Sequence, residues 1–181
     1  ASIVNDVSGL ADPEVADVCA RGGARLVITH TTVPPKVKGF PGTGDVRAFF
    51  EARMELAAGR GVPEEAIVLD PGSDLGKTPA ETVAVLRMLP LLGELGRPLL
   101  LAVSHKDFVG AITGRPPKER LAGTLAAVGF GVEAGASILR VHDVPEVRDY
   151  LAVRAALRGE AEAPEEPLAE GLRRASIHRA G

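Results

Sequence analysis

The chain has 181 residues, of which 24 are acidic and 21 are basic, and its formal net charge is −3. This length suffices for one domain with a buried core, and the near balance of charge excludes a general attraction to nucleic acid or to an anionic membrane. The single cysteine excludes an internal disulfide and is typical of a reducing compartment, so we expect a cytoplasmic protein without nucleic-acid or membrane partners.

Short apolar runs alternate with helical patterns along most of the chain. The runs consist almost entirely of Val, Ile and Leu, which is typical of strands buried on both faces. Proline and glycine throughout residues 31–43 predict a long loop after the second strand. In chain order we expect strands at residues 2–4, 26–28, 67–69, 98–103 and 137–141, and helices at about 12–21, 45–60, 78–93, 119–135 and 145–158.

This strict alternation predicts a parallel sheet covered by helices. A doubly wound sheet and a (β/α)8 barrel both fit the pattern. The sequence opens directly on a strand and without Met, so we expect the natural protein to begin further upstream. We place the domain at residues 1–159. Residues 160–181, acidic at first and then basic, we expect to form a partly disordered tail, in which Leu168, Leu172 and Ile177 allow one short helix.

The third strand ends abruptly at Asp70, which is followed by a loop containing Pro71 and Gly72. Thr78-Pro79 then predicts the N-cap and first turn of a helix. A carboxylate at the carboxyl end of a buried parallel strand is a common position for a ligand-binding residue. Asp70 fits a structural role equally well, in which it accepts hydrogen bonds from the amides of its own loop.

Polar residues follow every predicted strand. The carboxyl ends of parallel strands meet at one face, so these residues predict a binding site there. They are Asn5 and Asp6; Thr29 and His30; Asp70; Ser104, His105 and Lys106; and Arg140, His142 and Asp143.

Arg140 and His142 lie two residues apart, which places both on the same face of a strand. A guanidinium beside an imidazole favours an anion such as phosphate. The alternative is that Arg140 pairs with Asp143 or Glu146.

Lys106 has two open roles: it binds an acceptor oxygen on a ligand, or it neutralises Asp70. Asp70 and Asn5 together offer acceptors and an amide, which suit a flat heterocycle with an N–H edge. The residues therefore suggest a heterocyclic substrate bound deep in the site, with an anionic leaving group toward its rim.

Five segments, in the same order and at similar spacing, resemble dihydropteroate synthase. They are Val-Asn-Asp-Val-Ser-Gly at 4–9, Leu-Asp-Pro-Gly at 69–72 with Gly-Lys at 76–77, Ser-His-Lys at 104–106, Glu-Arg-Leu-Ala-Gly-Thr at 119–124, and Arg-Val-His-Asp-Val at 140–144. The resemblance runs from residue 2 to about residue 158. It implies a (β/α)8 TIM barrel, of which this chain supplies the last five βα units.

The resemblance also implies an activity. The family reaction belongs to folate biosynthesis: an alkyl/aryl transferase condenses a dihydropterin pyrophosphate with p-aminobenzoate and releases pyrophosphate. The resemblance implies that Asn5 and Asp70 bind the pterin ring and that Ser104 lies near p-aminobenzoate. Lys106 contacts the pterin carbonyl region, while Arg140 and His142 hold the pyrophosphate. Lys106, Arg140 and His142 are thus the expected catalytic residues.

The resemblance further implies Mg²⁺ held through the substrate pyrophosphate. We expect no metal ligand within this chain, because the family's acidic strand-end residues belong to βα units that precede it. A homodimer is also implied.

The chain departs from the family pattern at several positions. Thr29 precedes His30 where the family has Met, Asp74-Leu75 replaces Gly-Phe, and His105 replaces Arg. Two alternatives therefore stand beside the synthase: a pterin-binding homologue without synthase activity that acts in binding or regulation, and a folate methyltransferase-type enzyme on the same barrel.

Overall fold

The computed structural model describes residues 1–33, 39 and 42–173. Within these residues one parallel sheet contains five strands in the order β1-β2-β3-β4-β5. The strands are β1 (Ile3–Asp6), β2 (Arg25–Thr29), β3 (Ile67–Asp70), β4 (Leu99–Leu101) and β5 (Ala136–Leu139). A doubly wound sheet reverses its strand order at a switch point, whereas a barrel keeps sequence order. The observed order therefore favours the barrel.

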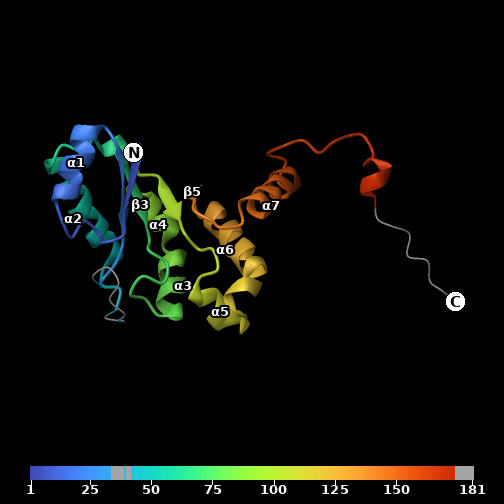
Figure 1. Cartoon of the computed structure of the whole chain (residues 1–181), viewed down its shortest axis with the longest axis horizontal. Coiled ribbons are helices and arrows are strands. Elements are labelled where there is room, and N and C mark those ends of the chain that lie inside the picture. Colours follow the sequence, from blue (N-terminus) through green and yellow to red (C-terminus); the bar gives the residue numbers. More distant parts are fainter. Residues whose placement is uncertain (34–38, 40–41, 174–181) are drawn as a thin grey trace.

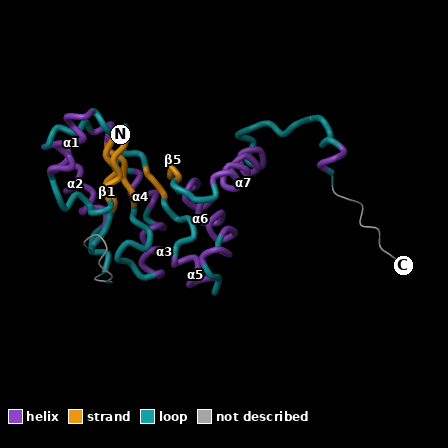
Figure 2. The backbone as a smooth tube through the Cα atoms, in the orientation of Figure 1, coloured by secondary structure: helices purple, strands orange, loops and turns teal. Residues whose placement is uncertain are grey.

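Helices connect successive strands and pack along the sheet, and the last α-helix follows the last strand (Figures 1 and 2). They are α1 (Glu14–Gly22), α2 (Val46–Gly59), α3 (Pro79–Arg87), α4 (Leu89–Gly93), α5 (Asp107–Thr113), α6 (Leu121–Glu133) and α7 (Val144–Leu157), with 3-10 turns η1 (Glu64–Ala66), η2 (Pro117–Glu119) and η3 (Glu170–Leu172). No helix in the described part of the chain has the length and apolarity to cross a membrane.

Local sequence accounts for most of these boundaries. The Asp45 carboxylate accepts the Ala48 amide at the start of α2, and Thr78 forms a capping box with Glu81 at the start of α3. Pro90 divides the helix expected at 78–93, because it lacks an amide hydrogen and clashes with the preceding turn.

Two predictions for the elements were wrong. Helix α5 was not expected, and β5 ends at Leu139, so that Arg140 and His142 lie beyond the strand instead of on it. In the tail, the described residues up to 173 contain only the turn η3, while Ile177 and part of the loop expected at 31–43 lie outside the described residues.

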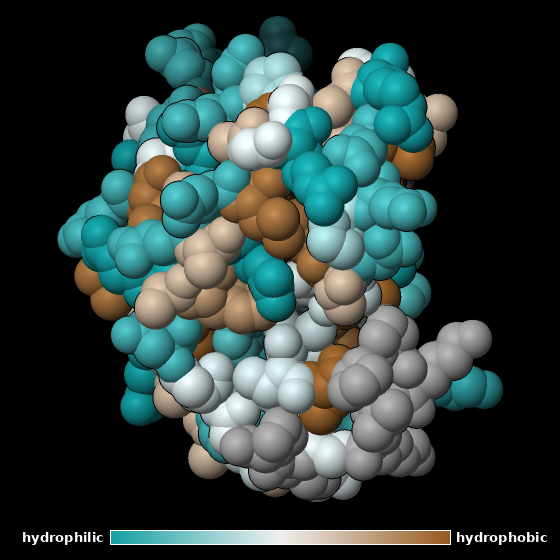
Figure 3. Space-filling view, turned by 90° about the vertical axis from the view of Figure 1, so that its left-hand side faces the viewer, coloured by the Kyte–Doolittle hydropathy of each residue, from teal (hydrophilic) through white to brown (hydrophobic). Residues whose placement is uncertain are grey.

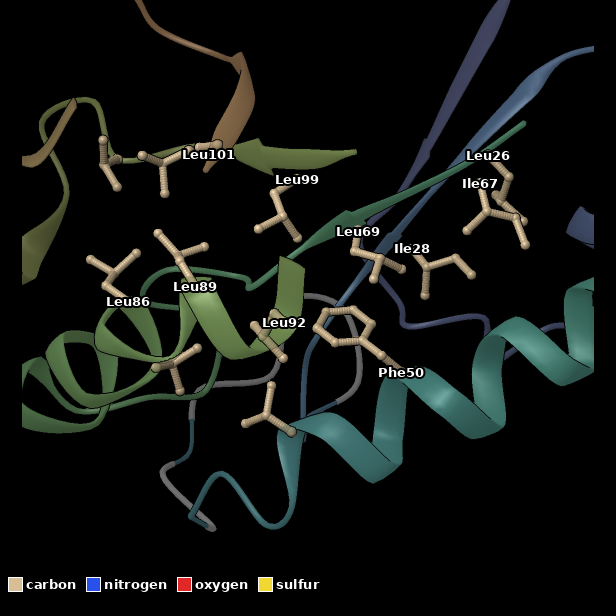
Figure 4. Close-up of a cluster of buried hydrophobic side chains, with 14 of the residues drawn as sticks. Leu26, Ile28, Phe50, Ile67, Leu69, Leu86, Leu89, Leu92, Leu99 and Leu101 are labelled. Carbon is tan, nitrogen blue, oxygen red and sulfur yellow. The ribbon is translucent and has the colours of Figure 1, made fainter. Parts of the chain in front are cut away.

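The two faces of the sheet carry different amounts of core. On one face Leu26, Ile28, Ile67 and Leu69 pack against the helices (Figure 4). Every helix from α1 to α7 contributes a buried side chain to this cluster. On the other face, called the inner face below, a small cluster contains Val27, Val68 and Leu100. The helix layer therefore provides most of the apolar burial.

The side of the molecule formed by α1 and α2 is largely hydrophilic, with small separate hydrophobic areas (Figure 3). Val18 on α1 is among the apolar side chains left exposed, at 56% of its surface. Scattered exposure of this kind is ordinary for a surface in contact with water.

Candidate functional site

The period of two along each strand positions the predicted site residues. In β3, Ile67 and Leu69 face the helices and Val68 faces inward, so Asp70 continues the inward row. In β5, Ile138 packs on the inner cluster, and Arg140 follows it two residues later. The alternation along β3 therefore directs Asp70 to the inner face, and Arg140, just beyond β5, lines a hollow together with the inner-face residues Val27 and Leu100.

Four of the predicted residues line one pocket of about 130 Å³ at the carboxyl ends of β4 and β5. Its lining consists of Ala102, Ser104, Lys106, Arg140, Val141 and His142. None of these side chains is acidic, while Lys106 and Arg140 each carry a positive charge. The pocket is therefore suited to an anion.

A larger hollow of about 550 Å³ shares Arg140 and Val141 with this pocket. Asn5 from β1 and Val27 from β2 also line it, so it follows the inner face of the sheet. Asn5 is exposed, because β1 is an edge strand. The predicted ring-binding residue Asn5 and the predicted anion-binding residue Arg140 thus lie on one continuous surface.

Asp70 lines neither hollow and is only 4% exposed. One of its carboxylate oxygens accepts the Gly72 amide at 2.8 Å, so the structural role considered from sequence is present. Burial raises the pKa of Asp70 to about 6, against the opposing effects of the Gly72 hydrogen bond and of the charges on Lys106, Lys77 and Arg140. The Lys106 charge favours the ionised form of Asp70, and the role of Lys106 toward a ligand stays a prediction.

The loop after β3 is closed by Lys77, a buried residue to which sequence reasoning assigned no role. Its Nζ donates to the carbonyl oxygens of His30 and Gly72, both at 2.9 Å, and of Leu75 at 3.2 Å. Burial lowers the pKa of Lys77 to about 8, although the Asp70 carboxylate opposes this shift. The position of a lysine between a glycine loop and a helix N-cap is the signal that sequence offered.

Replacing Lys77 by methionine is expected to lower the free energy of unfolding by about 3 kcal/mol, because buried carbonyl groups lose a charged donor. Urea denaturation measures the change. Lys118→Met, at an exposed position of η2, is the control and is expected to change stability by less than about 0.5 kcal/mol. Equal losses for the two variants would contradict this role for Lys77.

His30 follows β2 and is 1% exposed. Burial, and then the Lys77 charge, lower the pKa of His30 to about 4. The ring is therefore neutral near pH 7, and its Nε2 donates to the Thr43 carbonyl at 3.1 Å. His30 also packs edge-on against Phe49, so these contacts give it a structural role.

The loops after β4 and β5 are joined by side-chain contacts. Ser104 Oγ accepts the backbone amide of His142 at 3.2 Å and lies 3.0 Å from His142 Nδ1. His105 Nε2 donates to a carboxylate oxygen of Asp143. The alternative in which Arg140 pairs with Asp143 or Glu146 is wrong, since among the described residues Arg140 forms no ion pair. Arg140 is an exposed residue and lines both hollows, so it is accessible to a ligand.

No cluster of three or more His, Cys, Asp or Glu suited to a metal occurs within the described ranges. The pocket offers cationic groups and a hydroxyl, whereas magnesium prefers carboxylate oxygens and water. These residues fit an anion and do not fit a magnesium ion.

A parallel sheet in barrel order, with a pocket suited to an anion at the carboxyl ends of its strands, is typical of the α/β-barrel class of proteins. Residues 1–142 match the family described as pterin binding enzyme. The chain belongs to this family, as the sequence motifs indicated.

Curated relatives agree with this assignment. The dihydropteroate synthase of Synechocystis sp. is 39% identical over 170 residues, which cover 87% of this chain and 57% of that protein. The inactive dihydropteroate synthase 2 of Mycobacterium tuberculosis is 38% identical over 169 residues, which cover 88% of this chain and 53% of that protein. The chain thus spans about half the length of the curated relatives it matches.

Solved structures give the same picture of the fold. Dihydropteroate synthase from Xanthomonas albilineans in complex with 7,8-dihydropteroate matches with a TM-score of 0.80 and 34% identity, over 91% of this chain and 61% of that chain. The enzyme from Stenotrophomonas maltophilia, with imidazole bound in its active site, matches with a TM-score of 0.84 and 33% identity, over 91% and 63%. The prediction of a partial barrel is confirmed.

Proposed function

We propose that this protein is a dihydropteroate synthase-type transferase of folate biosynthesis, which condenses dihydropterin pyrophosphate with p-aminobenzoate and releases pyrophosphate. The observation that carries the proposal is the convergence of Lys106, Arg140 and His142 on one pocket without an acidic lining residue, close to the buried Asp70. Relatives solved with 4-aminobenzoic acid and with 7,8-dihydropteroate support the choice of substrates.

In the proposed reaction the p-aminobenzoate nitrogen attacks the pterin methylene carbon. The carbon–oxygen bond to pyrophosphate breaks, and its electron pair leaves with the pyrophosphate. Donors on Arg140 and His142 stabilise the charge that develops on the leaving group, and Asn5 and Asp70 hold the ring. Lys106 contacts the pterin carbonyl region, and Ser104 lies beside p-aminobenzoate. The attacking nitrogen loses one proton to water or to the released pyrophosphate, and no covalent enzyme intermediate is needed.

Further parts of the proposal concern the surroundings of the reaction. Mg²⁺ accompanies the substrate pyrophosphate and is not held by the residues described above. The protein acts in the cytoplasm as a homodimer, and its domain ends near residue 159. Each of these remains a prediction.

The second candidate is a pterin-binding protein without synthase activity. The specific observation in its favour is that relatives named inactive dihydropteroate synthase 2 are as similar to this chain as the dihydropteroate synthases are. The third candidate, a folate methyltransferase-type enzyme, is less favoured because Lys106, Arg140 and His142 of the synthase pattern are all retained.

Two measurements separate the first two candidates. Calorimetric titration with dihydropterin pyrophosphate and Mg²⁺ is expected to show binding, and absence of heat at millimolar ligand would contradict both pterin proposals. Incorporation of radiolabelled p-aminobenzoate into dihydropteroate then identifies the synthase. Binding without incorporation would identify the pterin-binding homologue.

Replacing Arg140 by alanine is expected to raise the Kd for dihydropterin pyrophosphate about tenfold or more, because a charged donor to the leaving group is lost. The Kd for a dihydropterin without pyrophosphate is expected to change less than about threefold, since Arg140 is not placed on the ring. Arg148→Ala is the control, because Arg148 lines the larger hollow but not the cationic pocket. Equal losses for the two ligands would contradict the anion-binding role.

A further inference from the structure

The backbone around Lys106 is held from several sides by residues of other elements. Lys106 lies between His105 and Asp107, where the loop after β4 passes into α5. It lines the cationic pocket, and its position depends on how this short segment is fixed.

Asp74, in the loop after β3, fixes the segment that follows Lys106. One of its carboxylate oxygens accepts the amides of Asp107 and Phe108, the first two residues of α5. Its other oxygen accepts the hydroxyl of Thr82 on α3 at 3.1 Å. These contacts satisfy amides that the first turn of a helix leaves without partners, so a residue 33 positions away in sequence caps α5.

His105 fixes the segment that precedes Lys106. Its ring donates to Asp143 after β5, its amide donates to Thr124 Oγ at 3.0 Å, and its carbonyl accepts from Arg120 at 2.9 Å. Asp74 and His105 also have left-handed backbones, with φ of 62° and 54°. Such backbones persist where surrounding contacts impose them.

We infer that Asp74 and His105 are positioning residues that hold Lys106 in its place in the pocket before any ligand binds. Both residues act through the backbone on either side of Lys106, and neither lines the pocket. The value of this arrangement to ligand binding rests on the proposed function, whereas the arrangement itself belongs to the free protein.

Hydrogen exchange of the ligand-free protein tests the inference directly. Asp74→Ala is expected to speed exchange of the Asp107 and Phe108 amides at least tenfold, because their acceptor is lost. Asp45→Ala is the matched control: Asp45 caps α2 through Ala48, so it is expected to speed exchange at Ala48 and to leave residues 107 and 108 within about twofold. Unchanged exchange at residues 107 and 108 in Asp74→Ala would overturn the inference.

The Asp74→Asn variant keeps a side-chain oxygen that accepts from these amides. It is expected to keep exchange at residues 107 and 108 within about threefold of the wild type. This variant decides the question if Asp74→Ala does not fold. If the Asp107 and Phe108 amides exchanged at least tenfold faster in Asp74→Asn than in the wild type, the role of the capping contact would be overturned.

A double-mutant cycle tests His105. His105→Ala and Asp143→Ala are each expected to speed exchange of the Lys106 amide. The double variant is expected to match the single variants within about twofold, because all three variants lose the same contact between His105 and Asp143. If the increase in exchange rate in the double variant equalled the product of the two single increases, the pairing of His105 with Asp143 would be overturned.

Ligand binding forms the final arm. Asp74→Ala and His105→Ala are each expected to raise the Kd for dihydropterin pyrophosphate about tenfold, and Asp45→Ala to leave it within about twofold. If the wild type itself does not bind this ligand, the proposed function fails, while the exchange experiments still decide the positioning role. Faster exchange with unchanged Kd would overturn the claim that positioning serves the ligand.

Discussion

Replacing Gly72 by alanine is expected to lower the free energy of unfolding by more than about 4 kcal/mol. Gly72 has φ of +68°, and a Cβ added there would overlap the His30 carbonyl oxygen and lie 3.2 Å from a Thr29 methyl carbon. That carbonyl is an acceptor of the buried Lys77 ammonium. The backbone cannot yield without breaking the contact that closes the loop, so strain and lost hydrogen bonding add together.

Urea denaturation of Gly23→Ala provides the matched control. Gly23 has φ of +61°, and no atom lies within 4 Å of an added Cβ. The control shares the left-handed backbone but not the collision, so it is expected to cost about 1–2 kcal/mol. Equal losses for the two variants would show that the loop absorbs the added methyl group and would contradict the prediction.

Replacing Asp70 by asparagine is expected to weaken ligand binding and to increase stability at pH 7. The Kd for dihydropterin pyrophosphate is expected to rise about 100-fold, because a charged acceptor toward the proposed ring N–H edge is lost. The free energy of unfolding is expected to rise by about 3 kcal/mol, because a buried carboxylate is replaced by a neutral amide of similar shape. The asparagine oxygen still accepts the Gly72 amide.

The pH dependence follows from the pKa of Asp70, which burial raises from 3.8 to about 6. Between these values the folded protein holds a proton that the unfolded chain has released. The Asp70 contribution to stability is therefore fully present below pH 3.8 and is lost as pH rises through 6. The free energies of unfolding of the wild type and Asp70→Asn are expected to be similar near pH 3.8 and to differ at neutral pH. A constant difference across the range would contradict the raised pKa.

The sequence allowed the sheet to be predicted because its strands are short, nearly pure runs of Val, Ile and Leu. It also allowed Ser104, Lys106, Arg140 and His142 to be predicted as neighbours, because parallel strands end at one face. Their roles toward a pterin remain predictions. Here local pattern and topology were enough, since neither depends on contacts between distant side chains.

Features that depend on distant contacts could not be predicted. Helix α5 has only seven residues, and its capping carboxylate comes from Asp74 in another loop. The three acceptors of Lys77 include His30, which lies 47 positions earlier. The choice between doubly wound sheet and barrel also needed the strand order, because both have the same βα alternation.

Successive side chains along β3 point to opposite faces of the sheet, so the residues of this strand follow a strict period of two. Ile67 and Leu69 belong to one side and Val68 and Asp70 to the other. Deleting a single residue within this strand would turn every later side chain over, placing the carboxylate among leucines and a leucine toward the ligand. Single substitutions in this strand therefore keep its facing pattern, whereas insertions or deletions keep it only when they comprise an even number of residues.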